Sequence, residues 1–270
     1  MSHSPAFSVI CAMESEAVHL RSVLDEVQER PLAHWRRSQG TLAGVGVEIV
    51  VCGIGMVNAA AATTALCVLE APRAVVSYGC SGAHHRDVFA GDVVLGNAVA
   101  HFTSYVLQAD GVRRHTGFGN EPGNETDPTA VKRSLTLPAD PALLALGRSA
   151  SVGLVLPVWP GREVPPQVHE GVVASADVWT QHADSIRALH EEFGSLCEEM
   201  EAAAIAQVCA QFGLPFLAVK DISNNELHAL TDLDAPGGSV LVHVEREVGR
   251  RAAEVVAALI RASVDRDAPS

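Results

Sequence analysis

The sequence predicts a single-domain α/β protein, with a twisted, mostly parallel central sheet between two helix layers in a three-layer α/β/α arrangement. Three observations support this prediction. Short apolar runs of strand length alternate with longer segments of helical periodicity. The apolar runs are almost uninterrupted, as in strands that are buried on both faces. The 270 residues suffice for one large core, and no repeat or convincing linker divides residues 1–270.

Each element follows from its local pattern. Phe7–Met13 is an apolar run that predicts a buried strand, and Glu14–Glu29 has helical spacing with acidic residues in its first turn, where the helix dipole favours them. The other predicted strands are Val45–Cys52, Ala74–Tyr78, Asp92–Leu95, Gly171–Ser175 and Pro215–Ile222. The other predicted helices are Asn58–Leu69, Pro141–Ser149, Ala183–Phe193, Met200–Phe212 and Val240–Ala262. Residues 111–133 are polar and contain several Gly and Pro, so an irregular insertion is expected there, and Asp265–Ser270 is expected to be a polar tail.

Composition narrows the class of partner. The formal net charge is −13, with Asp+Glu 32 against Lys+Arg 19, which disfavours nucleic acids and anionic membranes and leaves a small neutral or zwitterionic ligand. The six cysteines form no C-x-x-C pair, so we expect buried free thiols in a reducing cytosol and no metal site. No signal peptide and no apolar stretch of about 20 residues is visible, and the expected location is cytoplasmic.

Candidate binding residues gather where the predicted strands end, because ligands of parallel α/β sheets collect beyond the carboxyl ends of the strands. The segments with small or polar residues at such ends are Ala12–Glu16, Gly79–Gly82, Ser175–Trp179 and Lys220–Asn224. In addition, Glu199 and Glu201 precede a small apolar helix. Two readings of these acids stay open: they match the helix dipole, or a carboxylate grips two neighbouring hydroxyls, such as those of a ribose.

Several motifs, in this order, resemble the methylthioadenosine/S-adenosylhomocysteine nucleosidases and their purine nucleoside phosphorylase relatives. The matching stretches are Ala12–Glu16, Gly53–Ala60, Gly79–Gly82 with Gly91–Val94, Asp177–Trp179, Glu199–Ala206 and Pro215–Ser223. The resemblance covers nearly the whole chain except residues 111–133. It implies a nucleoside phosphorylase-like fold, cleavage of a purine nucleoside, no metal or organic cofactor, and a homodimer or higher homo-oligomer.

The resemblance also implies roles for individual residues. Glu201 would bind the ribose diol with Met200 against the sugar, Glu16 would position the attacking water, and Trp179 would lie against the base. An oxocarbenium-like sugar develops positive charge, which nearby carboxylates stabilise. The remaining residues expected to bind substrate are Cys80, Ser81, Gly82, Glu199, Lys220 and Ser223.

Three departures from the family pattern shape the functional prediction. Asn224 stands where the nucleosidases keep a catalytic Asp, with Asp221 as the alternative acid if the loop is reshaped. Cys80 replaces a serine, and Ser77 replaces the phosphate-binding Arg of the bacterial phosphorylases, although His84, His85 and Arg86 follow nearby. An amide donates and accepts hydrogen bonds but releases no proton. We therefore expect hydrolysis rather than phosphorolysis and a preference for a 6-oxopurine nucleoside. The alternatives are a phosphorylase with a rebuilt phosphate site and a non-catalytic nucleoside-binding or storage protein.

Overall fold

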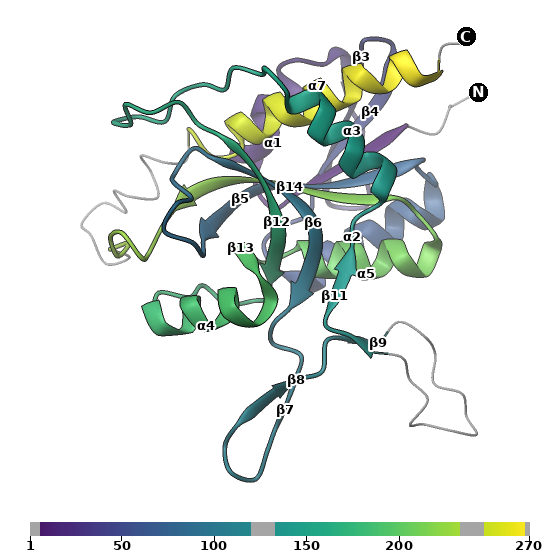
Figure 1. Cartoon of the computed structure of the whole chain (residues 1–270). Coiled ribbons are helices and arrows are strands. Elements are labelled where there is room, and N and C mark those ends of the chain that lie inside the picture. Colours follow the sequence, from purple (N-terminus) through teal and green to yellow (C-terminus); the bar gives the residue numbers. More distant parts are fainter. Residues whose placement is uncertain (1–5, 120–132, 233–245, 268–270) are drawn as a thin grey trace, which may run out of the picture.

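The computed structural model describes residues 6–119, 133–232 and 246–267, and the account below concerns these residues (Figure 1). The strands of the large sheet are β1 (Phe7–Cys11), β2 (Asp25–Glu29), β3 (Arg36–Leu42), β4 (Val45–Val51), β5 (Ala74–Ala83), β6 (Val93–His101), β11 (Thr136–Pro138), β12 (Val168–Ser175), β13 (Ser195–Glu199) and β14 (Phe216–Asn224). The helices are α1 (Glu14–Arg21), α2 (Met56–Leu69), α3 (Pro141–Ser151), α4 (Ala183–Phe193), α5 (Ala202–Phe212) and α7 (Arg250–Asp267). Two short strand pairs are β7 (Tyr105–Leu107) with β8 (Arg113–His115), and β9 (Phe118–Gly119) with β10 (Arg133–Ser134).

The large sheet is mixed, which corrects the expectation of a mostly parallel sheet. Its order is β11-β6-β12-β13-β5-β1-β4-β3-β2, and β14 pairs with both β5 and β6, so that β5, β14, β6, β12 and β13 form a closed ring. Half of this sheet's ten strand pairings among the described residues are parallel and half antiparallel. One cause is the two-residue turn Ala43-Gly44 between β3 and β4, in which both residues have positive φ (52° and 80°). Such a turn produces an antiparallel hairpin.

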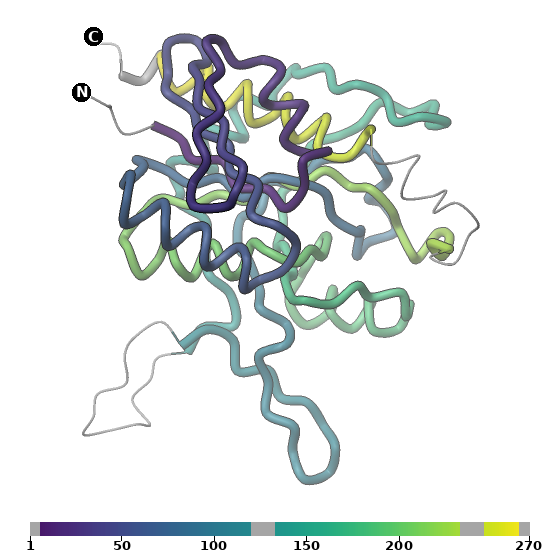
Figure 2. Tube along the Cα trace, turned by 180° about the vertical axis from the view of Figure 1, so that it is seen from behind, coloured from purple at the N-terminus to yellow at the C-terminus, as the bar shows by residue number. Residues whose placement is uncertain are grey.

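Two helix layers enclose the sheet, as the alternating pattern predicts. Helices α1, α3 and α7 pack on one face, where Leu20, Leu143 and Leu259 belong to one buried apolar cluster. Helices α2 and α5 pack on the other face, where Leu66 and Ile205 belong to a second cluster. Figure 1 shows these two groups on opposite sides of β5, β6 and β14, and Figure 2 shows the same layers from behind. Helix α4 packs on β12 and β13.

Most predicted elements are present, but several boundaries differ. The helix predicted over Glu14–Glu29 ends at Arg21, and Asp25–Glu29 is an exposed edge strand paired with β3, where Val27 is on the surface. Its helical spacing of apolar residues therefore does not mark a buried helix face. The segment Gly79–Gly82, expected as a turn, continues strand β5.

The C-terminal half differs in a similar way. Strand β13 directly precedes the predicted helix Met200–Phe212, which begins at Ala202. The helix predicted over Val240–Ala262 begins only at Arg250, after a turn with Gly249 at φ 79°, and it extends to Asp267. Residues 240–245 lie outside the described residues, and so does most of the predicted insertion 111–133, whose first residues form β8.

Candidate active site

A cavity of about 470 Å³ opens where β1, β5, β12, β13 and β14 end. Ten of the predicted site residues line it: Glu16, Cys80, Ser81, Gly82, Trp179, Glu199, Met200, Glu201, Ser223 and Asn224. The two others, Lys220 and Asp221, do not. The structure thus brings together residues that lie up to 208 positions apart in the sequence, from Glu16 to Asn224. Their meeting place is the one that the strand ends predict.

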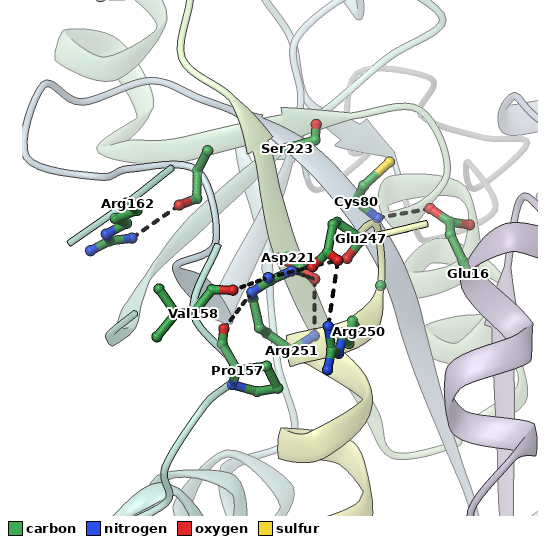
Figure 3. A network of polar contacts seen from close by, with 12 residues as sticks. Glu16, Cys80, Pro157, Val158, Arg162, Asp221, Ser223, Glu247, Arg250 and Arg251 are labelled. Carbon is green, nitrogen blue, oxygen red and sulfur yellow. Dashed lines mark hydrogen bonds and ion pairs between the residues drawn. The ribbon is translucent and has the colours of Figure 1, made fainter. Parts of the chain in front are cut away.

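Glu16 is held at the junction of β1 and β5. Its Oε2 accepts hydrogen bonds from the backbone N–H groups of Ala12 (3.1 Å) and Met13 (3.0 Å), and its Oε1 accepts one from the N–H of Cys80 (2.8 Å; Figure 3). The residue is only 2% exposed although it lines the cavity. The carboxylate therefore has one fixed orientation at the cavity wall.

Gly79 makes this arrangement sterically feasible. A Cβ at this position would lie 2.5 Å from Glu16 Oε1, and the backbone has φ 144°, which side-chain-bearing residues rarely adopt. The glycine that looked like a turn residue thus allows the close approach of a carboxylate to a strand. Beside it, burial and then the charge of Glu16 raise the pKa of the Cys80 thiol, so that this cysteine stays a neutral thiol.

Glu199, Glu201 and Lys220 form a buried charged cluster at the start of α5. Glu199 accepts hydrogen bonds from the backbone N–H groups of Glu201 and Ala202 at 2.9–3.1 Å, and its Oε2 lies 2.8 Å from Lys220 Nζ. Burial lowers the pKa of Lys220, but the charges of Glu199 and Glu201 outweigh it and leave that pKa raised. Lys220 is therefore the buried counter-ion of this cluster, behind the cavity wall.

Glu201 faces the cavity from the position directly before α5, where it is the N-cap residue. Its Oε1 accepts a hydrogen bond from the N–H of Gly55 (2.8 Å), in the loop before α2. Burial and, after it, the charge of Glu199 raise its pKa to about 8, against the opposing effect of Lys220. This carboxyl group therefore gains strongly from hydrogen-bond donors that favour its charged form.

Asn224, Trp179 and Glu226 form a second polar group on the cavity wall. Asn224 Nδ2 donates to Glu226 Oε1 (2.8 Å), while Ser223 Oγ donates to Asn224 Oδ1 (2.7 Å). Glu226 Oε1 also accepts from the indole Nε1 of Trp179 (3.3 Å), and Thr231 donates to both oxygens of Glu226 at 2.6–2.7 Å. The orientation of the Asn224 amide is thus set by its two neighbours.

Asp221 lies on the opposite side of β14 from the cavity, so the structure does not support it as the alternative acid. Its Oδ2 accepts a hydrogen bond from the backbone N–H of Arg251 (3.0 Å) and lies 3.9 Å from the guanidinium Nη1 (Figure 3). Successive side chains of a strand point to opposite faces, and Lys220 points toward Glu199. Burial raises the pKa of Asp221 to about 8 although Arg251 opposes it. Its perturbed pKa reflects the interior of the protein rather than the cavity.

Sequence reasoning missed three titratable residues that line the cavity: His84, Glu198 and Glu226. Glu226 follows Asn224 by two residues. Its position just after a candidate strand end is the sequence feature that could have identified it as a site residue. Glu198 directly precedes the singled-out Glu199 but points to other partners, Thr180 and His84. His84 was considered only for phosphate binding; of its two neighbours, His85 is half-exposed beside Asp87, and neither His85 nor Arg86 lines the cavity.

The residues that the structure describes contain neither a metal-binding cluster nor a membrane-spanning helix. No group of three or more His, Cys, Asp or Glu side chains in that part of the chain is placed to hold a metal ion. No helix in the described ranges combines the length and apolar character that a membrane span requires. The six cysteines are free thiols.

Comparison with known proteins assigns the chain to a family. The family model of the phosphorylase superfamily matches residues 7–265. The chain therefore belongs to the phosphorylase superfamily, and within it to the enzymes that cleave N-glycosidic bonds. The 5′-methylthioadenosine/S-adenosylhomocysteine nucleosidase of Bacillus cereus (strain B4264) is 33% identical over 218 residues, which cover 80% of this chain and 84% of the relative.

Solved structures agree on the fold. The nucleosidase of the same name from S. pneumoniae, with the transition-state inhibitor MT-ImmA, has a TM-score of 0.72 and 25% identity and covers 95% of this chain and 99% of its own. The futalosine hydrolase of Helicobacter pylori strain 26695 has a TM-score of 0.69 and 19% identity, with 97% and 98% covered. At that identity the second likeness concerns the fold alone.

Proposed function

We propose that this enzyme hydrolyses the N-glycosidic bond of purine ribonucleosides, with a preference for a 6-oxopurine base. The observation that carries this proposal is that different polar groups contact successive residues of strand β5. Glu16 accepts a hydrogen bond from the N–H of Cys80. Asn224 pairs with Gly82, which lies two residues further along the same strand. One end of the cavity thus suits a cationic sugar and the other a hydrogen-bonding base.

The sugar end contains the two acids that glycosidic cleavage requires. Glu201 can accept from both ribose hydroxyls, since a carboxylate has two acceptor oxygens. In this proposal Glu16 orients a water molecule and accepts its proton as the water oxygen bonds to C1′. As the C1′–N9 bond breaks, its electron pair goes to the base, and the developing positive charge of the sugar lies near both carboxylates.

Water is favoured over phosphate by the charge of the cavity. Its lining residues in the described chain include five glutamates, namely Glu16, Glu198, Glu199, Glu201 and Glu226, and neither arginine nor lysine. Ser77, at the position of the phosphorylases' arginine, is fully buried. Lys220 compensates Glu199 from behind the cavity wall, but no arginine or lysine is among the lining residues in the described chain, so the remaining carboxylates would repel a phosphate dianion, whereas they do not repel a neutral water.

The preference for a 6-oxo base rests on the orientation of Asn224. Because Ser223 donates to its Oδ1 and one N–H is donated to Glu226, the second N–H of the amide stays available for the substrate. O6 and N7 of a 6-oxopurine are adjacent acceptors, whereas a 6-amino group is a donor. Donation by Asn224 stabilises the leaving base without protonating it.

Product analysis tests this proposal. The enzyme is incubated with inosine, guanosine and adenosine, with and without inorganic phosphate, and the base and sugar products are separated by chromatography. Free ribose at a rate independent of phosphate, and a higher kcat/KM for inosine than for adenosine, are expected. Ribose 1-phosphate as the main product would contradict hydrolysis, and faster cleavage of adenosine would contradict the base preference while leaving hydrolysis intact.

A further inference from the structure

Glu198 is a buried carboxylate of the cavity wall for which the proposed reaction has no use. The residue is 6% exposed and lines the cavity. Its Oε1 accepts a hydrogen bond from the N–H of Thr180 (2.5 Å) and its Oε2 from Thr180 Oγ1 (2.8 Å). His84 Nε2 lies 3.2 Å from the same Oε2. Burying a carboxylate costs free energy. A carboxylate that is nevertheless held at a cavity wall is therefore a candidate for a functional role.

The register of the sheet places Glu198 opposite Asn224. Gly82 of β5 pairs with Glu198 of β13 on one side and with Asn224 of β14 on the other. Adjacent strands lie about 4.8 Å apart, so the Cα atoms of Glu198 and Asn224 are separated by about 10 Å across Gly82. The middle strand carries no side chain at this point: a Cβ on Gly82 would already lie 3.3 Å from Asn224 Nδ2.

The direction of β5 shows which part of a nucleoside lies over Gly82. Glu16, on the proposed sugar side, hydrogen-bonds the N–H of Cys80. Gly82 is two residues further along the strand, about 7 Å away at the usual rise per residue. A base bonded to the sugar would therefore lie over Gly82 with one edge toward Asn224 and the opposite edge toward Glu198.

We propose that Glu198 recognises the N1 edge of the base and makes a 2-amino-6-oxopurine, as in guanosine, the preferred base. This inference rests on the proposed function. Each oxygen of Glu198 accepts one hydrogen bond from Thr180 and has a second acceptor site, since a carboxylate oxygen carries two. Guanine presents two neighbouring donors, N1–H and the 2-amino group, to match the two oxygens. Hypoxanthine presents N1–H alone, and adenine presents an acceptor at N1, which a carboxylate repels.

A substrate series on the wild-type enzyme tests this inference without any variant. We expect kcat/KM for guanosine to exceed that for inosine by about tenfold or more, the usual effect of one additional hydrogen bond to a charged group. 1-Methylguanosine, which lacks the N1–H, should lose about tenfold or more relative to guanosine for the same reason. Equal values for guanosine and inosine would overturn the role of Glu198.

Glu198→Gln then assigns the effect to the residue. Because glutamine offers one acceptor and one donor group, the guanosine-to-inosine ratio should fall to near unity, and cleavage of adenosine should improve relative to guanosine. Glu170→Gln is the matched control, because Glu170 pairs with Arg148 outside the cavity, and its ratios should equal those of the wild type. An unchanged guanosine-to-inosine ratio in Glu198→Gln overturns this inference alone, whereas a wild-type enzyme that cleaves no 6-oxopurine nucleoside overturns the proposed base preference as well.

Discussion

Replacement of Glu201 by glutamine removes the carboxylate that we assign to the ribose diol while it keeps the size of the side chain. Glutamine has a single carbonyl acceptor, and Gly55 N–H already donates to one oxygen of Glu201 (2.8 Å). At least one hydroxyl would therefore lose its charged acceptor. A hydrogen bond to a charged group contributes about 1.5–3 kcal/mol, so kcat/KM for a ribonucleoside should fall roughly 10- to 150-fold.

The same variant should change how stability depends on pH. The pKa of Glu201 is raised to about 8 in the folded enzyme, chiefly by burial and then by Glu199, whereas an unfolded chain has a glutamate pKa near 4.3. Between these two values the folded state retains a proton that the unfolded state has lost. The contribution of Glu201 to stability is thus complete below about pH 4 and is lost as the pH rises toward 8, by up to about 1.4 kcal/mol per pH unit.

Two assays on the same preparations measure both effects. Steady-state cleavage of inosine and guanosine gives kcat/KM, and urea unfolding between pH 5 and pH 8 gives the free energy of unfolding for wild type and Glu201→Gln. The variant should unfold with a flatter pH dependence and be the more stable protein near pH 8. Glu163→Gln, an exposed position, is the control and should match the wild type in both assays. Turnover close to that of the wild type, together with an unchanged pH dependence, would refute the assignment of Glu201.

Three further substitutions address other parts of the site. Trp179 lines the cavity and is 41% exposed, so nucleoside or free base should quench or shift tryptophan fluorescence, and Trp179→Ala should abolish that change; a signal that survives would come from one of the two other tryptophans. Asn224→Asp introduces a carboxyl group that can donate a proton to N7, so the ratio of kcat/KM for adenosine over inosine should rise, by up to about 100-fold if general acid catalysis is restored; a ratio equal to that of the wild type would remove Asn224 from base recognition. Asp221→Asn should leave kcat/KM unchanged, because Asp221 faces Arg251 rather than the cavity, and a severe loss of turnover in a variant of wild-type stability would contradict that placement.

The sequence predicted the location of the site better than its chemistry at the base. The apolar runs located the strands, and seven of the ten predicted residues that line the cavity came from segments at predicted strand ends; Glu199, Met200 and Glu201 came from the start of a predicted helix and from the family resemblance. Alternation along the strand does not exclude Asp221, because Ser223, two residues later, lines the cavity. What separates Asp221 from the cavity is its hydrogen bond from the N–H of Arg251, which is 30 residues away in the sequence.

Other features had no local signal. The pairing of Glu198 and Asn224 with opposite sides of Gly82 depends on the register of three strands that are distant in sequence. The strand Asp25–Glu29 is exposed and pairs at the edge of the sheet, so burial left no pattern in its residues. The sheet is mixed partly because β14 pairs in parallel with β5 and antiparallel with β6. The residue pattern of a single segment does not predict such a double pairing.

The hydrogen bonds of Glu16 have a practical consequence for anyone who needs an inactive form of this enzyme. Its carboxylate joins the chain after β1 to the backbone of β5 through Ala12, Met13 and Cys80, and it fills the space that Gly79 leaves open. A substitution at Glu16 would therefore disturb the architecture together with the chemistry, and lost activity could not be attributed to either. Glu201, whose carboxylate accepts one backbone N–H among the described residues, is the cleaner position for a folded protein of strongly reduced activity, suited to slowing turnover for crystallography or to genetic complementation.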